Sequence, residues 1–320
     1  MRIIRKGIFL LLLAGILWLA SYVCSSISTG ANNLDLGRNN NVAGIQRERE
    51  DSIDLLVLGD SESYTAVSPM RLWEKTGITS YICGQTGQKI GETWYFLKTA
   101  LQNQSPRMVI LETNLLFRYQ GLTKEAQTAV SETGSYCFPV FRYHNLWKQL
   151  FGKKMMKTVN YKGFTIRDSV GAYKGGDYMM PSEEREKIEP AVRFYLDRIV
   201  RLCRKEGISL LLLSAPSPVN CTYQRHNAIS DYAEQKEIDY LDLNLKLKEL
   251  KIDWKVDSLD KGDHLNLSGA HKVTDYLSIY LKEQGTWTDH REDKDYQSWN
   301  MLSDAYEKQA RKALKKIQDG

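Results

Sequence analysis

A serine near the start of the chain and a histidine near its end are the residues best suited to chemistry. Ser61 directly follows an apolar run at 53–58, within a Gly-Asp-Ser-Glu tetrapeptide, and His264 lies in the loop 260–266. A serine hydroxyl is a weak nucleophile until an adjacent base takes its proton. A histidine can accept that proton and return it to a leaving group. The pair therefore predicts acyl transfer through Ser61.

An acidic residue is expected to orient the imidazole and to stabilise its charged form. Two aspartates in the same loop are candidates, Asp260 and Asp263. Asp263 adjoins His264, whereas Asp260 serves only if the loop contains a one-residue bulge. We favour Asp260, and the sequence leaves both open.

The elements that must position these residues alternate along the chain. Short, continuous apolar runs predict buried strands at 53–58, 78–83, 108–111, 208–213 and 238–243. Helical spacing predicts helices at 92–102, 189–205, 227–236 and 268–281. This alternation predicts an α/β fold, a three-layer doubly wound parallel sheet of about five strands. Ligands bind beyond the carboxyl ends of such strands, where Ser61 and His264 are expected.

In this order the segments resemble the SGNH/GDSL hydrolase superfamily over about 53–281. The family pattern has Gly-Asp-Ser after strand one, a glycine after strand two, an asparagine after strand three, and an Asp and a His before the last helix. The run Gly-Asp-His-Leu-Asn-Leu-Ser-Gly-Ala at 262–270 is the strongest match. The chain most resembles membrane-anchored extracytoplasmic members, such as the D-alanine transfer protein of teichoic acid modification and the SGNH proteins of alginate acetylation. The resemblance implies a flavodoxin-like strand order.

The resemblance also implies an oxyanion hole. Its donors would be the backbone N–H of Ser61, the backbone N–H of Gly87 in preference to Gly84, and the side-chain amide of Asn114. Two blocks depart from the family pattern. Lys261 stands where Asp-x-x-His expects the acid, and the third block reads Glu-Thr-Asn instead of Gly-x-Asn-Asp. These departures put the triad acid and the asparagine donor in doubt.

The ends of the chain are expected to lie outside the catalytic domain, which we place at 51–285. Residues 1–27 contain an apolar run with basic residues before it, which predicts a single-pass membrane anchor with the rest of the chain extracytoplasmic. A cleaved signal peptide is the alternative. We expect a linker at 28–50, an aromatic insertion between strands three and four at about 117–180, and a polar helical tail at 286–320.

Composition narrows the class of function. Net charge is +5, with basic and acidic residues interleaved, so no basic stripe for nucleic acid is expected. The five cysteines form no CxxC motif and no metal-like cluster with histidine, so neither a disulfide framework nor a metal or other cofactor is predicted. One disulfide bridge remains open.

We therefore expect a serine acyltransferase or acylesterase that transfers or removes a small, acetyl-like group on a cell-surface polysaccharide or cell-wall polymer. The resemblance implies a membrane-bound O-acyltransferase as partner. Two alternatives stay open, a secreted carbohydrate esterase and a non-catalytic SGNH-fold scaffold subunit, since fold alone does not secure activity.

Overall fold

The computed structural model describes residues 2–30, 34–146, 148 and 159–319. Its centre is a five-stranded parallel sheet in the order β2-β1-β3-β4-β5, as predicted. The strands are β1 Leu55–Gly59, β2 Ser80–Gly84, β3 Met108–Glu112, β4 Ser209–Ser214 and β5 Asp239–Asp242. The first three are buried along their whole length, which explains their continuous apolar sequence.

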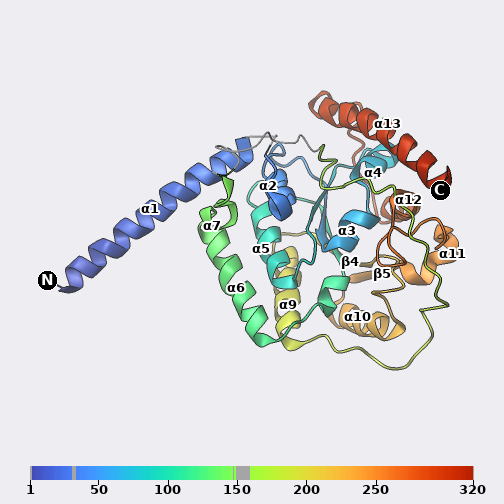
Figure 1. Ribbon diagram of the computed structural model, residues 1–320, viewed down its shortest axis with the longest axis horizontal. Coiled ribbons are helices and arrows are strands. Elements are labelled where there is room, and N and C mark those ends of the chain that lie inside the picture. The colour runs from blue at the N-terminus through green and yellow to red at the C-terminus, as the bar shows by residue number, and fades with distance from the viewer. Residues whose placement is uncertain (1, 31–33, 147, 149–158, 320) are drawn as a thin grey trace.

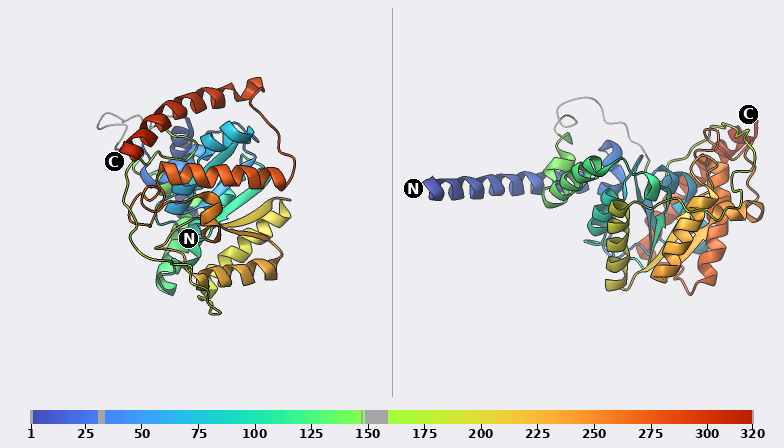
Figure 2. Two further views of the ribbon diagram at one scale, coloured as in Figure 1. Left: turned by 90° about the vertical axis from the view of Figure 1, so that its right-hand side faces the viewer. Right: turned by 90° about the horizontal axis from the view of Figure 1, so that it is seen from below.

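Helices cover both faces of the sheet, giving three layers (Figures 1 and 2). One face carries α3 Ser61–Ala66, α4 Pro69–Thr76 and α12 Leu267–Glu283, and α12 contacts both of the others. The other carries α5 Ile90–Ala100, α9 Pro190–Lys205 and α10 Tyr223–Lys236. Shorter elements are η2 Asn114–Phe117, η3 Leu243–Lys246, α11 Leu247–Leu250 and η4 Lys294–Tyr296. The sequence analysis predicts neither α3 nor α4.

The N-terminal helix α1, Arg2–Gly30, projects away from the sheet (Figure 1). It is long and apolar enough to cross a membrane, a test that a signal sequence also passes. The stretch expected as a linker contains η1 Gly37–Asn39 and α2 Asn40–Ile45 instead. Val42, Ala43 and Ile45 are almost fully buried, because α2 packs against β2. Much of this stretch is therefore part of the folded domain.

Parts of the insertion are helical, and the tail is helical as predicted but packs against the domain. In the insertion, α6 Leu122–Cys137 packs against α5, and α7 Val140–Tyr143 contacts α1. The rest of its described part, from residue 159 to 180, is nearly without regular structure. In the tail, α13 Gln297–Asp319 lies across α4 and α12 and buries Trp299 and Tyr306. Residues 147 and 149–158 of the expected insertion lie outside the described part of the chain.

Candidate active site

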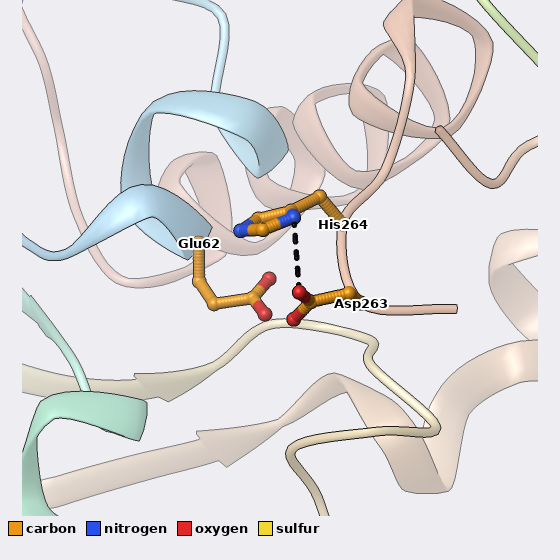
Figure 3. A group of neighbouring side chains, drawn as sticks. All are labelled: Glu62, Asp263 and His264. Atoms are coloured by element: carbon orange, nitrogen blue, oxygen red, sulfur yellow. Dashed lines mark ion pairs between the residues drawn. The ribbon is translucent and has the colours of Figure 1, made fainter. Parts of the chain in front are cut away.

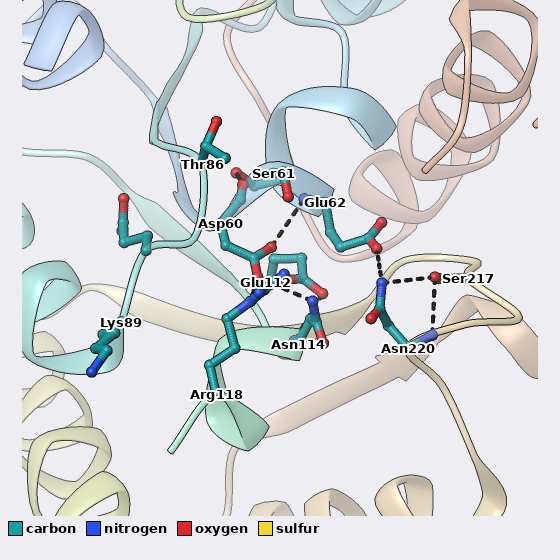
Figure 4. Close-up of polar contacts among 12 residues, drawn as sticks. Asp60, Ser61, Glu62, Thr86, Lys89, Glu112, Asn114, Arg118, Ser217 and Asn220 are labelled. Atoms are coloured by element: carbon teal, nitrogen blue, oxygen red, sulfur yellow. Dashed lines mark hydrogen bonds and ion pairs between the residues drawn. The ribbon is translucent and has the colours of Figure 1, made fainter. Parts of the chain in front are cut away.

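Ser61 is the first residue of α3, directly beyond the carboxyl end of β1. Asp60 is the N-cap of this helix, and its carboxylate accepts a hydrogen bond from the Glu62 backbone N–H at 3.0 Å. The Asn114 side-chain amide donates to the same carboxylate at 3.0 Å, and Arg118 forms an ion pair with it. Figure 4 shows these groups gathered below the start of α3. Asp60 therefore fixes the turn that presents Ser61.

His264 links the two ends of the chain at this point. Its Nε2 lies 2.8 Å from the Ser61 hydroxyl oxygen, across 203 residues of sequence. Its Nδ1 lies 2.7 Å from a carboxylate oxygen of Asp260. The nearest ion-pair distance to Asp263 is 3.6 Å. Of the two candidate acids, Asp260 makes the hydrogen bond to the imidazole, which places the proton on Nδ1 and leaves Nε2 to accept from the serine.

The loop before α12 contains the bulge that this pairing needs. Lys261 and Gly262 both have left-handed backbone conformations, with φ of +65° and +93°. The turn they form lets the Asp260 carboxylate also accept from the His264 backbone N–H at 2.7 Å. The insertion braces the loop, since the Lys261 N–H donates to the Gly171 carbonyl at 2.7 Å. A four-residue separation thus replaces the three-residue one of the family pattern.

Asp263 belongs to a different set of contacts. The side-chain amide of Asn220 lies 2.6 Å from a carboxylate oxygen of Asp263 and 2.7 Å from one of Glu62. Asn220 also lies 3.1 Å from the Ser217 hydroxyl (Figure 4). That hydroxyl donates to the Asp263 carbonyl at 2.8 Å. Asn220 therefore ties Asp263 to the acid that follows the nucleophile.

The floor of the site holds buried carboxyl groups. Glu62 and Glu112 are 1% and 2% exposed. Burial raises the pKa of both groups well above the usual range, and the charge of Asp60 nearby adds to the effect. Each also has one carboxyl oxygen without a hydrogen-bond partner among the described residues. In both groups burial therefore favours the protonated form, whereas Asp60 pairs with Arg118.

The predicted oxyanion donors occupy two sides of Ser61. Gly84 ends β2 in a close-packed position, where an added Cβ would lie 2.3 Å from the Ser63 hydroxyl and 2.9 Å from the Gly59 carbonyl oxygen. Gly87 is exposed in the following loop, with φ of +63° and open space around its Cα. The Asn114 amide has one proton directed to Asp60 and a second that remains available. The assignment of these donors stays a prediction.

One group near the nucleophile has the composition of a cation site. Donor atoms of Glu62, Asp263 and His264 lie within 4.8 Å of one another (Figure 3). Oxygen and imidazole donors suit several divalent metals. Here, however, the two ring nitrogens of His264 already hydrogen-bond to Ser61 and Asp260. The arrangement serves proton transfer at the serine better than metal binding.

Sequence reasoning assigned no role to Glu62, Arg118 or Asn220. A signal existed for Glu62, because it directly follows Ser61 in the Gly-Asp-Ser-Glu segment beyond a predicted strand. Asn220 and Arg118 follow β4 and β3 at the expected carboxyl edge. Their identities alone did not distinguish them from ordinary loop residues.

The chain was compared with protein families, curated proteins and solved structures. No family model and no curated protein matches this chain. Among solved structures, a GDSL-like lipase from Bacteroides thetaiotaomicron is 10% identical with a TM-score of 0.42, covering 78% of this chain and 99% of that one. A protein named as an acylhydrolase from Bacteroides fragilis is 12% identical with a TM-score of 0.41, covering 78% and 97%. A protein assigned to the G-D-S-L lipolytic family from Desulfitobacterium hafniense is 13% identical with a TM-score of 0.39, covering 70% and 97%. At these values the function has to be argued from the side chains.

Proposed function

We propose that this protein is a serine acyltransferase or acylesterase of the SGNH type. The observation that carries the proposal is the continuous hydrogen-bonded chain from Asp260 through His264 to Ser61. An exposed acid, a half-buried imidazole and a hydroxyl at a helix start form the relay that acyl transfer at serine requires. Neither a cofactor nor a metal is needed for it.

The proposed reaction has two halves. His264 Nε2 takes the proton of the Ser61 hydroxyl while the serine oxygen attacks the ester carbon. The tetrahedral oxyanion is stabilised by the backbone N–H groups of Ser61 and Gly87 and by the second amide proton of Asn114. Collapse breaks the bond to the leaving alcohol, which receives the proton from His264, and leaves an acyl-serine. Water or a sugar hydroxyl then reverses these steps and releases Ser61.

The setting of the reaction is part of the proposal. We propose that α1 anchors the chain in the membrane with the sheet outside the cell, because basic residues precede its apolar stretch. The acyl group is small, the acceptor is a cell-surface polysaccharide or cell-wall polymer, and the partner is a membrane-bound O-acyltransferase. These three points follow from the family resemblance of the sequence. A secreted carbohydrate esterase would use the same serine with water as acceptor.

The test uses the full-length chain in detergent, a fluorophosphonate probe and 4-nitrophenyl acetate. We expect an adduct on Ser61 by mass spectrometry and ester turnover that falls at least about a thousandfold in Ser61→Ala. The matched control is Ser298→Ala, an exposed serine on α13. A folded wild-type protein with neither adduct nor turnover would contradict the proposal and favour the scaffold alternative.

A further inference from the structure

A cavity of about 190 Å³ opens at the carboxyl end of β2, and Tyr64 of the helix that starts at Ser61 is part of its lining. The lining consists of polar and glycine residues, among them Arg38, Asn41, Tyr64, Gly84, Thr86 and Arg167. Nothing in the proposed acyl transfer uses Arg38, Tyr64 or Arg167. The lining combines two guanidinium groups with hydroxyl and amide donors, which is unusual for a site meant for an apolar ligand.

The cavity walls belong to the elements that carry the proposed reaction. Tyr64 lies one turn after Ser61 on α3, and its hydroxyl is 2.7 Å from that of Thr86 in the loop after β2. The Arg167 carbonyl accepts a hydrogen bond at 2.8 Å from the backbone N–H of Leu267, the first residue of α12. A ligand group in the cavity therefore lies next to the helix that starts at Ser61 and the loop that carries His264.

Arg38 is held in place but keeps unused donors. Its Nη2 lies 3.1 Å from a Glu92 carboxylate oxygen and 3.3 Å from the Thr86 carbonyl oxygen. About half of the side chain, 52%, is exposed. A guanidinium carries five N–H donors in a fixed fork, so the contacts made through Nη2 leave others for a ligand. Glu92 thus orients Arg38 at the mouth of the cavity.

Arg167 supplies the positive charge that is not balanced. Its side chain is exposed and makes no hydrogen bond or ion pair among the residues that the structure describes. The neighbouring acid, Asp168, is paired with Lys316 at 2.9 Å. Asp35 lines the adjoining cavity and not this one. The lining contains two arginines and no acidic residue, so it has a net positive charge, which the ion pair of Arg38 with Glu92 offsets only in part.

We propose that this cavity, which we call the arginine cavity, binds an anionic group of the substrate, so that the enzyme acts on esters of negatively charged saccharides. The proposal rests on the proposed function, because it assigns a substrate class to the same serine. Paired guanidinium groups match the oxygen geometry of phosphate and carboxylate, and charge-assisted hydrogen bonds are about twice as strong as neutral ones. The cavity thereby selects which ester reaches the nucleophile.

The experiment compares acetate release from 3-O-acetylglucose with release from 3-O-acetylglucose 6-phosphate and 3-O-acetylglucuronate, using the full-length chain in detergent. We expect kcat/KM to be about tenfold or more higher for at least one charged ester. Arg38→Gln combined with Arg167→Gln should remove this preference, by lowering kcat/KM for the charged esters to about that of the neutral ester. Arg311→Gln, an exposed arginine on α13, leaves the preference intact.

Arg167→Gln alone keeps the test valid if the double variant fails to fold, because Arg167 holds no other described side chain. Its expected effect is a partial loss of the preference. Equal kcat/KM for charged and neutral esters in the wild type overturns the proposal, as does a preference that persists in both variants. Failure of the proposed function is a separate outcome, because 4-nitrophenyl acetate turnover would then be absent or unchanged in Ser61→Ala.

Discussion

The two sides of Ser61 differ in charge and in the volume of the cavity that they contain. On the side of β3 and β4, the carboxyl groups of Asp60, Glu62 and Glu112 are buried, and the cavity there measures only about 10 Å³. On the side of β2, the arginine cavity measures about 190 Å³ and carries net positive charge. Both sides lie at the carboxyl edge of one sheet, so the fold alone does not account for the difference.

The contrast indicates that the acidic side supports the loops of the site, whereas the basic side is suited to binding a ligand. On the acidic side the polar groups bond to one another, with Asn114, Arg118 and Asn220 as the donors that hold the carboxyls. Such a packed network rigidifies the start of α3 and the loop of His264. On the basic side donors remain unused and space is open. We therefore infer that the polar part of a substrate enters over β2.

The largest expected effect is on kcat/KM, and it distinguishes the two aspartates of the loop that contains His264. If Asp263 belongs to the supporting side, Asp260→Asn should lower kcat/KM for 4-nitrophenyl acetate by about 10²–10⁴-fold, because the imidazole loses the acid that orients it. Asp263→Asn, the matched control in the same loop, should cost less than about tenfold. The reverse order of the two variants would break the comparison and assign the triad acid to Asp263.

A smaller effect, on the free energy of unfolding, is expected when two glycines on the β2 side are replaced by alanine. Gly84→Ala should cost about 1–3 kcal/mol in the free energy of unfolding, because the new Cβ meets the Ser63 hydroxyl and the Gly59 carbonyl oxygen. Gly87→Ala enters open space and should cost only about 1 kcal/mol, from its left-handed backbone. Chemical denaturation measures both. Equal costs would mean that the close packing under α3 ends before Gly84.

The last expected effect is on the pH dependence of stability, and it arises from the buried carboxyl groups of the acidic side. Because burial raises the pKa of Glu112 in the folded state, the folded protein keeps a proton that the unfolded chain releases above its ordinary pKa. Stability should therefore fall as pH rises above the ordinary carboxyl range, with a slope of at most about 1.4 kcal/mol per pH unit for this group. Thermal unfolding of Glu112→Gln should show a shallower slope. The exposed Glu249→Gln should keep the wild-type slope, and an unchanged slope in Glu112→Gln would mean that Glu112 is ionised.

Much of the sheet and of the helices that cover it could be predicted from local sequence patterns. The strand predicted at 108–111 is found at Met108–Glu112, and the helix predicted at 189–205 is found at Pro190–Lys205. Both carry strong periodic or continuous apolar signals. In contrast, α2 is short and follows a stretch rich in Asn, Gly and charge, and α13 is rich in Lys, Gln and Asp. Their sequences indicate a linker and a polar tail, yet both bury apolar residues against the core. Whether a weakly apolar segment packs depends on the surface that the rest of the fold offers it.

The sequence by itself determined the order of strands and helices and the residue types at the carboxyl edge, because hydrophobic periodicity and turn residues act over short range. It identified Ser61 and His264 as partners through their order along the chain. Only the tertiary structure shows that Asp260 and not Asp263 hydrogen-bonds to His264, since this contact depends on left-handed backbone at Lys261 and on the contacts of Asn220. Only the fold, likewise, brings Arg38 and Arg167 into one cavity, because contacts between distant segments leave no local pattern.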